Sequence, residues 1–234
     1  MTVVVTDGAR LGKADQVYVQ LRAEIVSGVL APGRTLPETE LVAYTGASRT
    51  PVREAVRRLA AEGLIDLEPR RAPMVSRISL RSARQLFEFR QVLEPVAISM
   101  VATREVGAGD LRQAIETLLS TFGRLKGQEY SPAFQEAFTA ATGQFDALLA
   151  DHAPNEYLSR SILELRPHSA RLRHIAHADT SRLQESIGEH IRMCQAVLDG
   201  QAEEAAAAMV EHLQHVASSI FRRLLDSNTE LLVQ

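Results

Sequence analysis

The chain has 234 residues, 45% of them hydrophobic, so it is long and apolar enough to bury the cores of two ordinary domains. A net charge of -3 excludes a protein that coats nucleic acid through overall positive charge, although basic residues slightly outnumber acidic ones up to about Ser79. The single cysteine, Cys194, excludes an internal disulfide and is expected to be a small buried side chain. No apolar run reaches the roughly 18 residues of a membrane helix, and residues 1–10 lack a secretory signal pattern. The sequence therefore predicts a cytoplasmic protein with no membrane partner.

The N-terminal region begins with a predicted flexible arm, residues 1–14, and then shows helical periodicity. Apolar side chains recur at helical spacing from Asp15 to near Gly28, at Val17, Leu21, Ile25 and Val26. A turn is expected over 31–33 and a short helix over 38–45. Gly46, directly after that helix, is typical of a left-handed helix cap.

The next segment reads as a DNA recognition helix. Ser48 and Thr50 are good N-cap residues, and Pro51 is tolerated in the first turn of a helix. One helical face carries the apolar side chains Val52, Val56 and Leu59, and another carries the basic side chains Arg49, Arg53 and Arg57. A basic face near a helix N-terminus suits the major groove of DNA. Arg58 points away from Arg49 on a helical wheel and is expected to be a surface or interdomain residue.

Two short strands are predicted after Gly63, over 64–68 and 74–78, because their residues alternate in polarity. The residues 69–73 would join them as a wing. Residues 15–78 are therefore predicted to form a winged helix-turn-helix domain.

This region resembles the GntR family of bacterial transcription regulators, most closely in the run Ser48-Arg49-Thr50-Pro51-Val52-Arg53-Glu54-Ala55. The resemblance implies that Arg49, Thr50 and Arg53 contact bases and phosphates of a double-stranded DNA operator. The expected DNA-binding residues are Arg34, Ser48, Arg49, Thr50, Arg53, Arg57, Arg70 and Arg71. For Arg34, Arg57 and Arg70 the alternative is an ordinary solvated surface. The wing departs from the family, which usually has a glycine where this chain has Ala72-Pro73.

A second domain, residues 79–230, is predicted to be all-α because leucine, alanine, glutamate and arginine recur at spacings of three and four. The predicted helices span 80–104, 108–126, 131–150, 156–178, 180–199 and 202–227. Pro167 is expected to kink or split the fourth of them. Helices joined by such short loops pack as a bundle, and bundles hold ligands between their helices.

This bundle resembles the FCD-type effector domain of the FadR subfamily. The likeness rests on the run from Phe89 to Pro95, on the run from Phe145 to Ala150, and on Glu189-His190 with the later residues up to His212. The resemblance implies a ligand-binding and dimerisation domain. Together with the N-terminal match it covers almost the whole chain.

Many members of this subfamily bind a divalent metal through an aspartate and a histidine four residues apart, plus two later histidines. Here the later pair is present as His190 and His212, whereas Thr142 replaces the aspartate and Asp146 replaces the histidine. The resulting prediction is a zinc, nickel, manganese or iron site formed by Asp146, His190 and His212. The alternative is that the two histidines are polar groups of a solvated pocket or surface residues. Substitute ligands are His215, His174 and His177.

A small carboxylate is the expected effector, and the resemblance places Arg90 near its pocket. A guanidinium there would pair with the effector or with Glu94, four residues on in the same helix. The predicted effector-binding residues are Arg90, Thr142, Asp146, His190 and His212.

The sequence thus predicts a homodimeric transcription regulator that binds a pseudo-palindromic operator and responds to a metabolite, without enzyme activity. A metal-dependent hydrolase is one alternative, but no further carboxylate has motif-level support as its general base. A ligand-free architectural DNA-binding protein is the other alternative.

Overall fold

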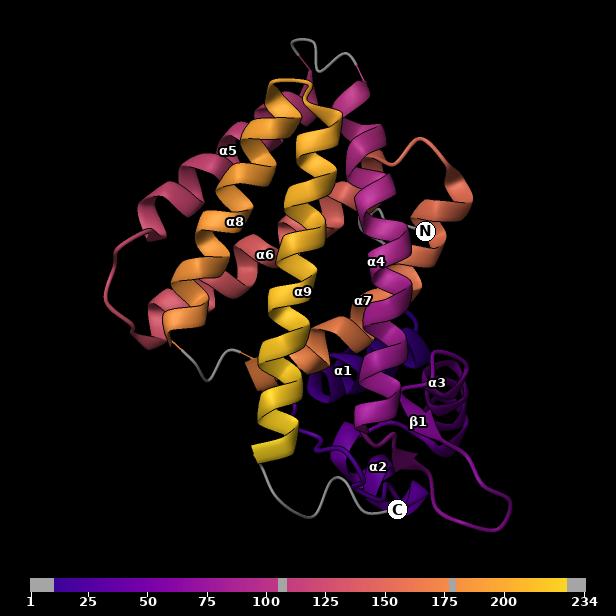
Figure 1. Cartoon of the computed structure of the whole chain (residues 1–234). Coiled ribbons are helices and arrows are strands. Elements are labelled where there is room, and N and C mark those ends of the chain that lie inside the picture. The colour runs from indigo at the N-terminus through magenta and orange to yellow at the C-terminus, as the bar shows by residue number, and fades with distance from the viewer. Residues whose placement is uncertain (1–10, 105–108, 177–179, 227–234) are drawn as a thin grey trace. The chain divides into compact units, whose positions relative to one another are not determined.

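The structure is a computed structural model that describes residues 11–104, 109–176 and 180–226. Within these ranges the chain divides into two compact units (Figure 1). One contains the described residues as far as Ser79 together with Pro167–His174, and the other contains Leu80–Arg166 and the residues from Ile175 onward. In the described part of the chain, no helix combines the length and apolar character that crossing a membrane requires. Most of the predicted arm, and His177, fall outside the described ranges.

The first unit is a winged helix-turn-helix, as predicted. Its elements in chain order are α1 (Lys13–Val26), α2 (Glu38–Thr45), α3 (Arg49–Ala61), β1 (Ile65–Asp66) and β2 (Met74–Val75). The two strands are antiparallel, with Ile65 opposite Val75, and Thr35 forms a further bridge to Met74. Both strands are shorter than the predicted spans 64–68 and 74–78, although the amide of Ser76 still donates to the carbonyl of Leu64 beyond the paired residues.

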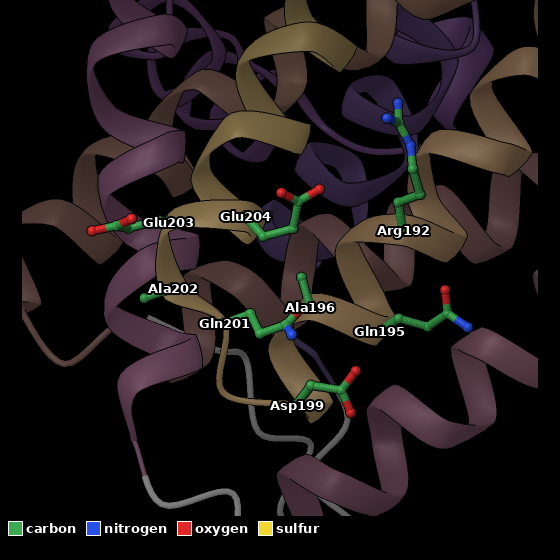
Figure 2. Close-up of a pocket in the computed structure, with 8 residues that line it drawn as sticks. All are labelled: Arg192, Gln195, Ala196, Asp199, Gln201, Ala202, Glu203 and Glu204. Atoms are coloured by element: carbon green, nitrogen blue, oxygen red, sulfur yellow. The ribbon is translucent and has the colours of Figure 1, made fainter.

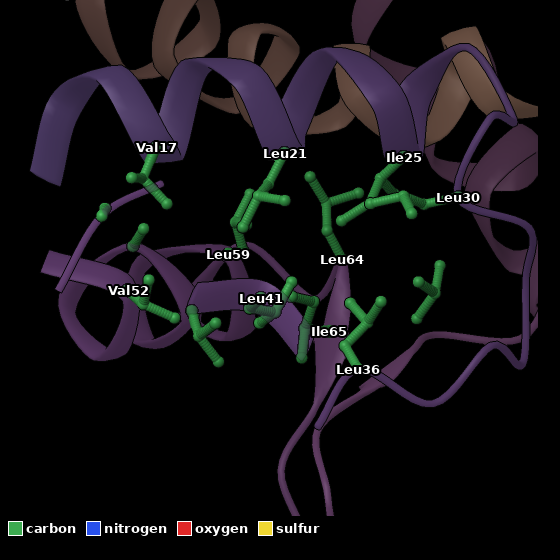
Figure 3. Close-up of a cluster of buried hydrophobic side chains, with 14 residues drawn as sticks. Val17, Leu21, Ile25, Leu30, Leu36, Leu41, Val52, Leu59, Leu64 and Ile65 are labelled. Atoms are coloured by element: carbon green, nitrogen blue, oxygen red, sulfur yellow. The ribbon is translucent and has the colours of Figure 1, made fainter. Parts of the chain in front are cut away.

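The core of this unit lies between α1, α2, α3 and the wing (Figure 3). Helix α1 contributes Val17, Leu21 and Ile25, and α3 contributes Val52 and Leu59, all of them buried. These are the apolar stripes that the sequence predicts. Because α3 buries one stripe, its arginine face is left at the surface.

The ends of α2 and α3 are set by local backbone conformation. Gly46 caps α2 with a left-handed φ of 63°, which confirms the prediction. Ser48 occupies the N-cap position of α3 in an extended conformation, but its side chain makes no capping hydrogen bond. Of the two predicted N-cap candidates, Ser48 and Thr50, Ser48 therefore holds the N-cap position, but it does not form the expected hydroxyl capping bond.

The wing has an unusual residue at its turn. Arg70 has a φ of 64°, in the left-handed region that favours glycine. The amide of Arg71 donates to the carbonyl of Glu68, which closes a four-residue turn around Pro69 and Arg70. The chain thus keeps a left-handed turn residue in the wing without using a glycine for it.

The second unit is built from helices, as predicted. They are α4 (Leu80–Thr103), α5 (Asp110–Leu125), α6 (Pro132–His152), α7 (Glu156–Ala176), α8 (Thr180–Leu198) and α9 (Ala202–Asp226). The segment Pro167–His174 of α7 belongs to the first unit. Helix α4 packs along α9, α8 packs against both α5 and α9, and α6 packs against α5. Pro167 lies inside α7 and does not split it.

Large apolar side chains fill the space between these helices. Phe87, Phe122 and Phe138 are almost completely buried. Cys194 is also buried, as predicted, and burial raises the pKa of its thiol to about 12. A thiol with such a pKa is an inert packing group at neutral pH.

Candidate nucleic-acid interface and buried histidine cluster

The arginines of α3 form an exposed basic face. The side chains of Arg49 and Arg53 are 71% and 60% exposed, and Arg57 is exposed one turn further on. The other predicted DNA-binding residues are exposed as well, namely Arg34, Ser48, Thr50, Arg70 and Arg71. All eight are therefore accessible to a partner.

An acidic residue of α2 contacts two of these arginines. Arg53 donates from Nε to Oε2 of Glu38 at 2.5 Å and from Nη2 to Oε1 at 3.2 Å. Arg49 lies beside the same carboxylate, with 3.5 Å from Nε to Oε1. The hydrogen bond from Arg53 lowers the pKa of Glu38, so this carboxylate is ionised at neutral pH. Sequence reasoning missed Glu38, because the contact depends on how α2 packs beside α3.

Arg58 has a side chain that is 41% exposed, as expected for a surface residue, and it also contacts α1. Its Nη1 donates to Asp15 at 2.7 Å, and its guanidinium lies 3.9 Å from the ring centroid of Tyr18. Asp15 and Tyr18 both belong to α1, so Arg58 ties α3 to α1. The surface position was predicted, whereas the contact with α1 was not, because a helical wheel does not show which neighbouring helix meets the face.

In the second unit, His190 of α8 and His212 of α9 come together. Both side chains are buried, and their rings meet edge to face with centroids 4.7 Å apart. Phe122 and Phe145 flank the ring of His190 at 4.8 and 5.1 Å. The two histidines are thus a polar pair within an aromatic interior.

Hydrogen bonds fix the orientation of both imidazoles. His190 Nδ1 lies 2.7 Å from the backbone oxygen of Ser186, and His212 Nδ1 lies 2.6 Å from Oε2 of Glu189. A carbonyl and an ionised carboxylate only accept hydrogen bonds, so Nδ1 carries the hydrogen in each ring. In the neutral form, the lone pair of each ring is then on Nε2.

Glu189 is the centre of a buried network that the sequence analysis did not identify. Arg182 donates to both of its oxygens, at 2.9 and 2.6 Å, and His215 Nδ1 lies 2.7 Å from Oε1. Burial raises the pKa of Glu189, but hydrogen bonds from His212 and Arg182 outweigh burial and lower it to about 2. Burial lowers the pKa of His212, which keeps that imidazole neutral. The signal available in the sequence was the helical spacing of Arg182 and Glu189 on α8.

The remaining predicted effector residues lie on α4 and α6. Arg90 forms a bidentate pair with Glu94, at 2.6 and 3.0 Å, and both are buried. Burial lowers the pKa of Arg90, but the negative charges of Glu94 and Asp146 outweigh it and raise the pKa. Thr142 is buried, and its hydroxyl donates to the backbone oxygen of Thr139. The structure therefore gives Arg90 the internal partner that the sequence left as an alternative.

The donor atoms do not assemble into a three-ligand metal site as they stand. Among the residues that the structure describes, no three histidine, cysteine, aspartate or glutamate side chains are placed to share one ion. His190 and His212 are adjacent, but the nearest buried carboxylate, Glu189, is already engaged by Arg182. The metal site therefore stays a prediction, with two adjacent imidazoles and no third ligand in place among the described side chains.

A separate open hollow of about 820 Å³ lies beside the turn between α8 and α9 (Figure 2). Its charged side chains are Arg192, Asp199, Glu203 and Glu204. No predicted effector residue is among the described residues that line it. The hollow is thus distinct from the predicted effector residues.

Comparison with known proteins identifies both units. The sequence matches the FCD domain family over residues 85–215 and the bacterial regulatory proteins of the gntR family over residues 13–75. The HTH-type transcriptional repressor RspR of Escherichia coli (strain K12) is 26% identical over 215 residues, which cover 92% of this chain and 91% of that protein. The Nta operon transcriptional regulator of Aminobacter aminovorans is 25% identical over 206 residues, which cover 88% of this chain and 93% of that protein.

Solved structures show the same fold. Escherichia coli McbR/YncC superposes with a TM-score of 0.70 at 20% identity, covering 91% of this chain and 99% of that one. A putative GntR transcriptional regulator from Rhodococcus sp. RHA1 gives a TM-score of 0.72 at 20% identity, covering 89% of this chain and 97% of that one. Since the FCD match spans more than half of the sequence and the gntR match spans the winged helix-turn-helix, the chain belongs to the gntR family of bacterial transcription regulators and carries an FCD domain.

Proposed function

We propose that this regulator binds its operator through α3 as a homodimer, and that a small carboxylate bound in the FCD domain changes its affinity for DNA. The observation that carries the ligand site is a group of buried polar side chains between helices that otherwise pack apolar groups. Its members are Arg90, Glu94, Thr142, Arg182, Glu189, His190 and His212. Burying charges adds little to stability compared with apolar packing, so a core built for stability alone has no need of them.

The DNA half of the proposal rests on the exposed basic face of α3. Arg49 and Arg53 project from the first turns of the helix, where side chains reach base edges in the major groove. Guanidinium groups there suit guanine, and backbone amides at the N-terminus suit phosphate. Arg34, Arg57, Arg70 and Arg71 are proposed to contact phosphates, which fix the register of the protein on the duplex. A two-fold dimer would place two such helices on a pseudo-palindromic site.

The choice of a carboxylate rests on the charges in the cluster. Arg90 and Arg182 are buried cations whose present partners are internal carboxylates, and the adjacent imidazoles become donors at Nε2 when protonated. A ligand carboxylate would add the anion that stabilises such protonation. The ligand regulates DNA binding only if it binds the two functional states of the dimer with different affinity.

A divalent metal is a second candidate ligand, favoured by one observation. Both imidazoles carry their hydrogen on Nδ1, so the Nε2 lone pairs are those that a metal would take. Asp146 is the proposed third ligand and would have to reorient, since the described side chains form no three-ligand group. Zinc, nickel, manganese and iron are the ions that suit such donors.

The test uses the purified full-length protein and a duplex selected from random sequences for tightest binding. Small mono- and dicarboxylates are added, and both the melting temperature of the protein and its affinity for the duplex are measured. We expect at least one carboxylate to raise the melting temperature and change DNA affinity in the wild type, and to do neither in His190→Ala. If no carboxylate shifts either quantity, the carboxylate proposal fails and the alternative of an architectural DNA-binding protein gains support. If the selection yields no preferred duplex, the regulator proposal fails.

A further inference from the structure

One carboxylate lies between the two arginines that are proposed to read DNA. Glu38 is in the first turn of α2 and contacts Arg53 through two hydrogen bonds and Arg49 through one ion pair. All three side chains are exposed or partly exposed, so this contact is not needed to satisfy a buried charge. Glu38 contacts the same two arginines that are proposed to read DNA, so it can affect DNA binding directly.

The geometry of the contact leaves a defined edge of Arg53 for another partner. Glu38 engages Nε and one hydrogen of Nη2, which is the side of the guanidinium. A guanidinium has five N–H groups, so Nη1 and the outer hydrogen of Nη2 remain as an end-on fork. A fork of this kind fits O6 and N7 of guanine. Glu38 thus holds the side chain by one edge and leaves the reading edge available.

The charge of Glu38 acts differently on bases and on phosphates. A phosphate that approaches Arg49 or Arg53 meets a fixed negative charge a few ångströms away, whereas a guanine edge carries no net charge. Non-specific binding depends almost entirely on phosphate contacts. An ionised carboxylate at this place therefore weakens non-specific binding more than it weakens guanine recognition.

We infer that Glu38 is a specificity-determining residue of the DNA interface: it orients Arg53 for base recognition and discourages both arginines from binding phosphate. The inference rests on the proposed function, because it requires α3 to read DNA. The lowered pKa of Glu38 fits this role, since the carboxylate stays charged at neutral pH.

The experiment compares Glu38→Gln with Glu40→Gln. Glu40 lies on the same helix and pairs with Arg34 at 2.6 Å, so its change removes the same charge without touching the arginines of α3. Fluorescence anisotropy gives the affinity of each protein for the selected duplex and for a scrambled duplex of the same length and composition, over a series of salt concentrations. The ratio of the two affinities is the specificity.

We expect Glu38→Gln to bind the scrambled duplex several-fold more tightly and to lower the specificity by about tenfold, the equivalent of 1.4 kcal/mol. For the scrambled duplex, the slope of log affinity against log salt concentration should become steeper by about the amount that one phosphate contact contributes. Glu40→Gln should shift both affinities by a similar factor and leave the specificity unchanged. In an Arg53→Ala background, Glu38→Gln should lose most of its effect on specificity.

Two results would overturn the inference. One is a specificity of Glu38→Gln equal to that of the wild type, with an unchanged melting temperature showing that the variant is folded. The other is an equal loss of specificity in Glu40→Gln, which would assign the effect to overall charge. Failure of the proposed function would give a different result. In that case Arg49→Ala and Arg53→Ala would leave the affinities for the selected and the scrambled duplex unaltered.

Discussion

The imidazole of His212 donates through Nδ1 to Oε2 of Glu189, with 2.6 Å between the two atoms. Both side chains are buried, and the same carboxylate accepts two hydrogen bonds from Arg182. Arg182 neutralises the charge of Glu189, so His212 needs no charge of its own to make this contact. The pair therefore combines an ionised acid with a neutral base, and each should respond to pH in its own range.

Replacing Glu189 tests the acid side of this pair. Its pKa in the folded protein, about 2, lies below the ordinary value of 4.5, so its ionised form stabilises the fold above pH 4.5 and this contribution is lost as the pH falls toward 2. At about 1.4 kcal/mol per pH unit, the shift corresponds to roughly 3 kcal/mol. Glu189→Gln should lower the free energy of unfolding by about that amount at pH 7, and by much less at pH 2.5, in urea titrations.

The control for this variant is Glu203→Gln on the exposed first turn of α9. It should have little effect at either pH, because exposed carboxylates contribute little. A deficit of Glu189→Gln that stays constant from pH 5 to pH 2.5 would contradict the assigned cause.

Replacing His212 tests the base side. Burial lowers the pKa of His212 below its ordinary value of 6.5, and the hydrogen bond to Glu189 only partly opposes this. Because the unfolded chain then binds the proton more readily, this histidine destabilises the fold as the pH falls below 6.5. The wild type should lose free energy of unfolding between pH 7.5 and 5.5, and His212→Gln should lose less. His152→Gln is the matched control, and equal losses in all three proteins would show that His212 does not titrate as described.

The recognition helix and the wing should differ in how their arginines affect DNA binding. Arg49→Ala is expected to reduce affinity for the selected duplex by about 1–3 kcal/mol and to relax sequence preference, as for a lost guanine contact. Arg70→Ala should weaken binding to selected and scrambled duplexes alike, as for a lost phosphate contact. Anisotropy titrations of both duplexes give the answer. If Arg49→Ala keeps both affinity and preference, α3 is not the reading element.

The wing turn allows a prediction about stability. Arg70 has a φ of 64°, which costs a residue with a Cβ about 1 kcal/mol relative to glycine. Arg70→Gly should therefore be more stable than Arg70→Ala by about 1 kcal/mol in urea titrations. Arg71→Gly is the control, because no left-handed φ is found there among the described residues, and glycine should only destabilise it. Equal stabilities of Arg70→Gly and Arg70→Ala would rule out strain at this turn.

Features with a local signal were predictable from the sequence. The buried stripe of Val52 and Leu59 on α3, the left-handed cap at Gly46 and the helical second unit all follow from spacing and residue type. The two wing strands were predicted at the right positions, but the predicted spans were too long. The polarity of the residues continues to alternate beyond the residues that pair.

Contacts between distant residues were not predictable in this way. Glu38 and Arg53 are 15 positions apart, and Glu189 and His212 are 23 apart. No periodicity relates them, so they become neighbours only through helix packing. The resemblance to FCD domains indicated His190 and His212 as a pair, but it gave no sign that Glu189 carries the network around them.

The last prediction concerns a metal at the histidine pair. If Asp146, His190 and His212 hold a divalent ion, protein purified without chelators should contain about one ion per chain, and EDTA should lower its melting temperature, because a ligand that binds only the folded state stabilises it. His190→Ala should contain no ion and should not respond to EDTA. Thr142→Asp adds a carboxylate where the resemblance to FCD domains implies one, so it should bind the ion more tightly. Its buried charge should lower the melting temperature of the metal-free protein. Wild-type protein that is metal-free by elemental analysis, and whose melting temperature ignores added zinc, nickel and manganese, would reject the metal site and leave the two imidazoles as donors to an anion.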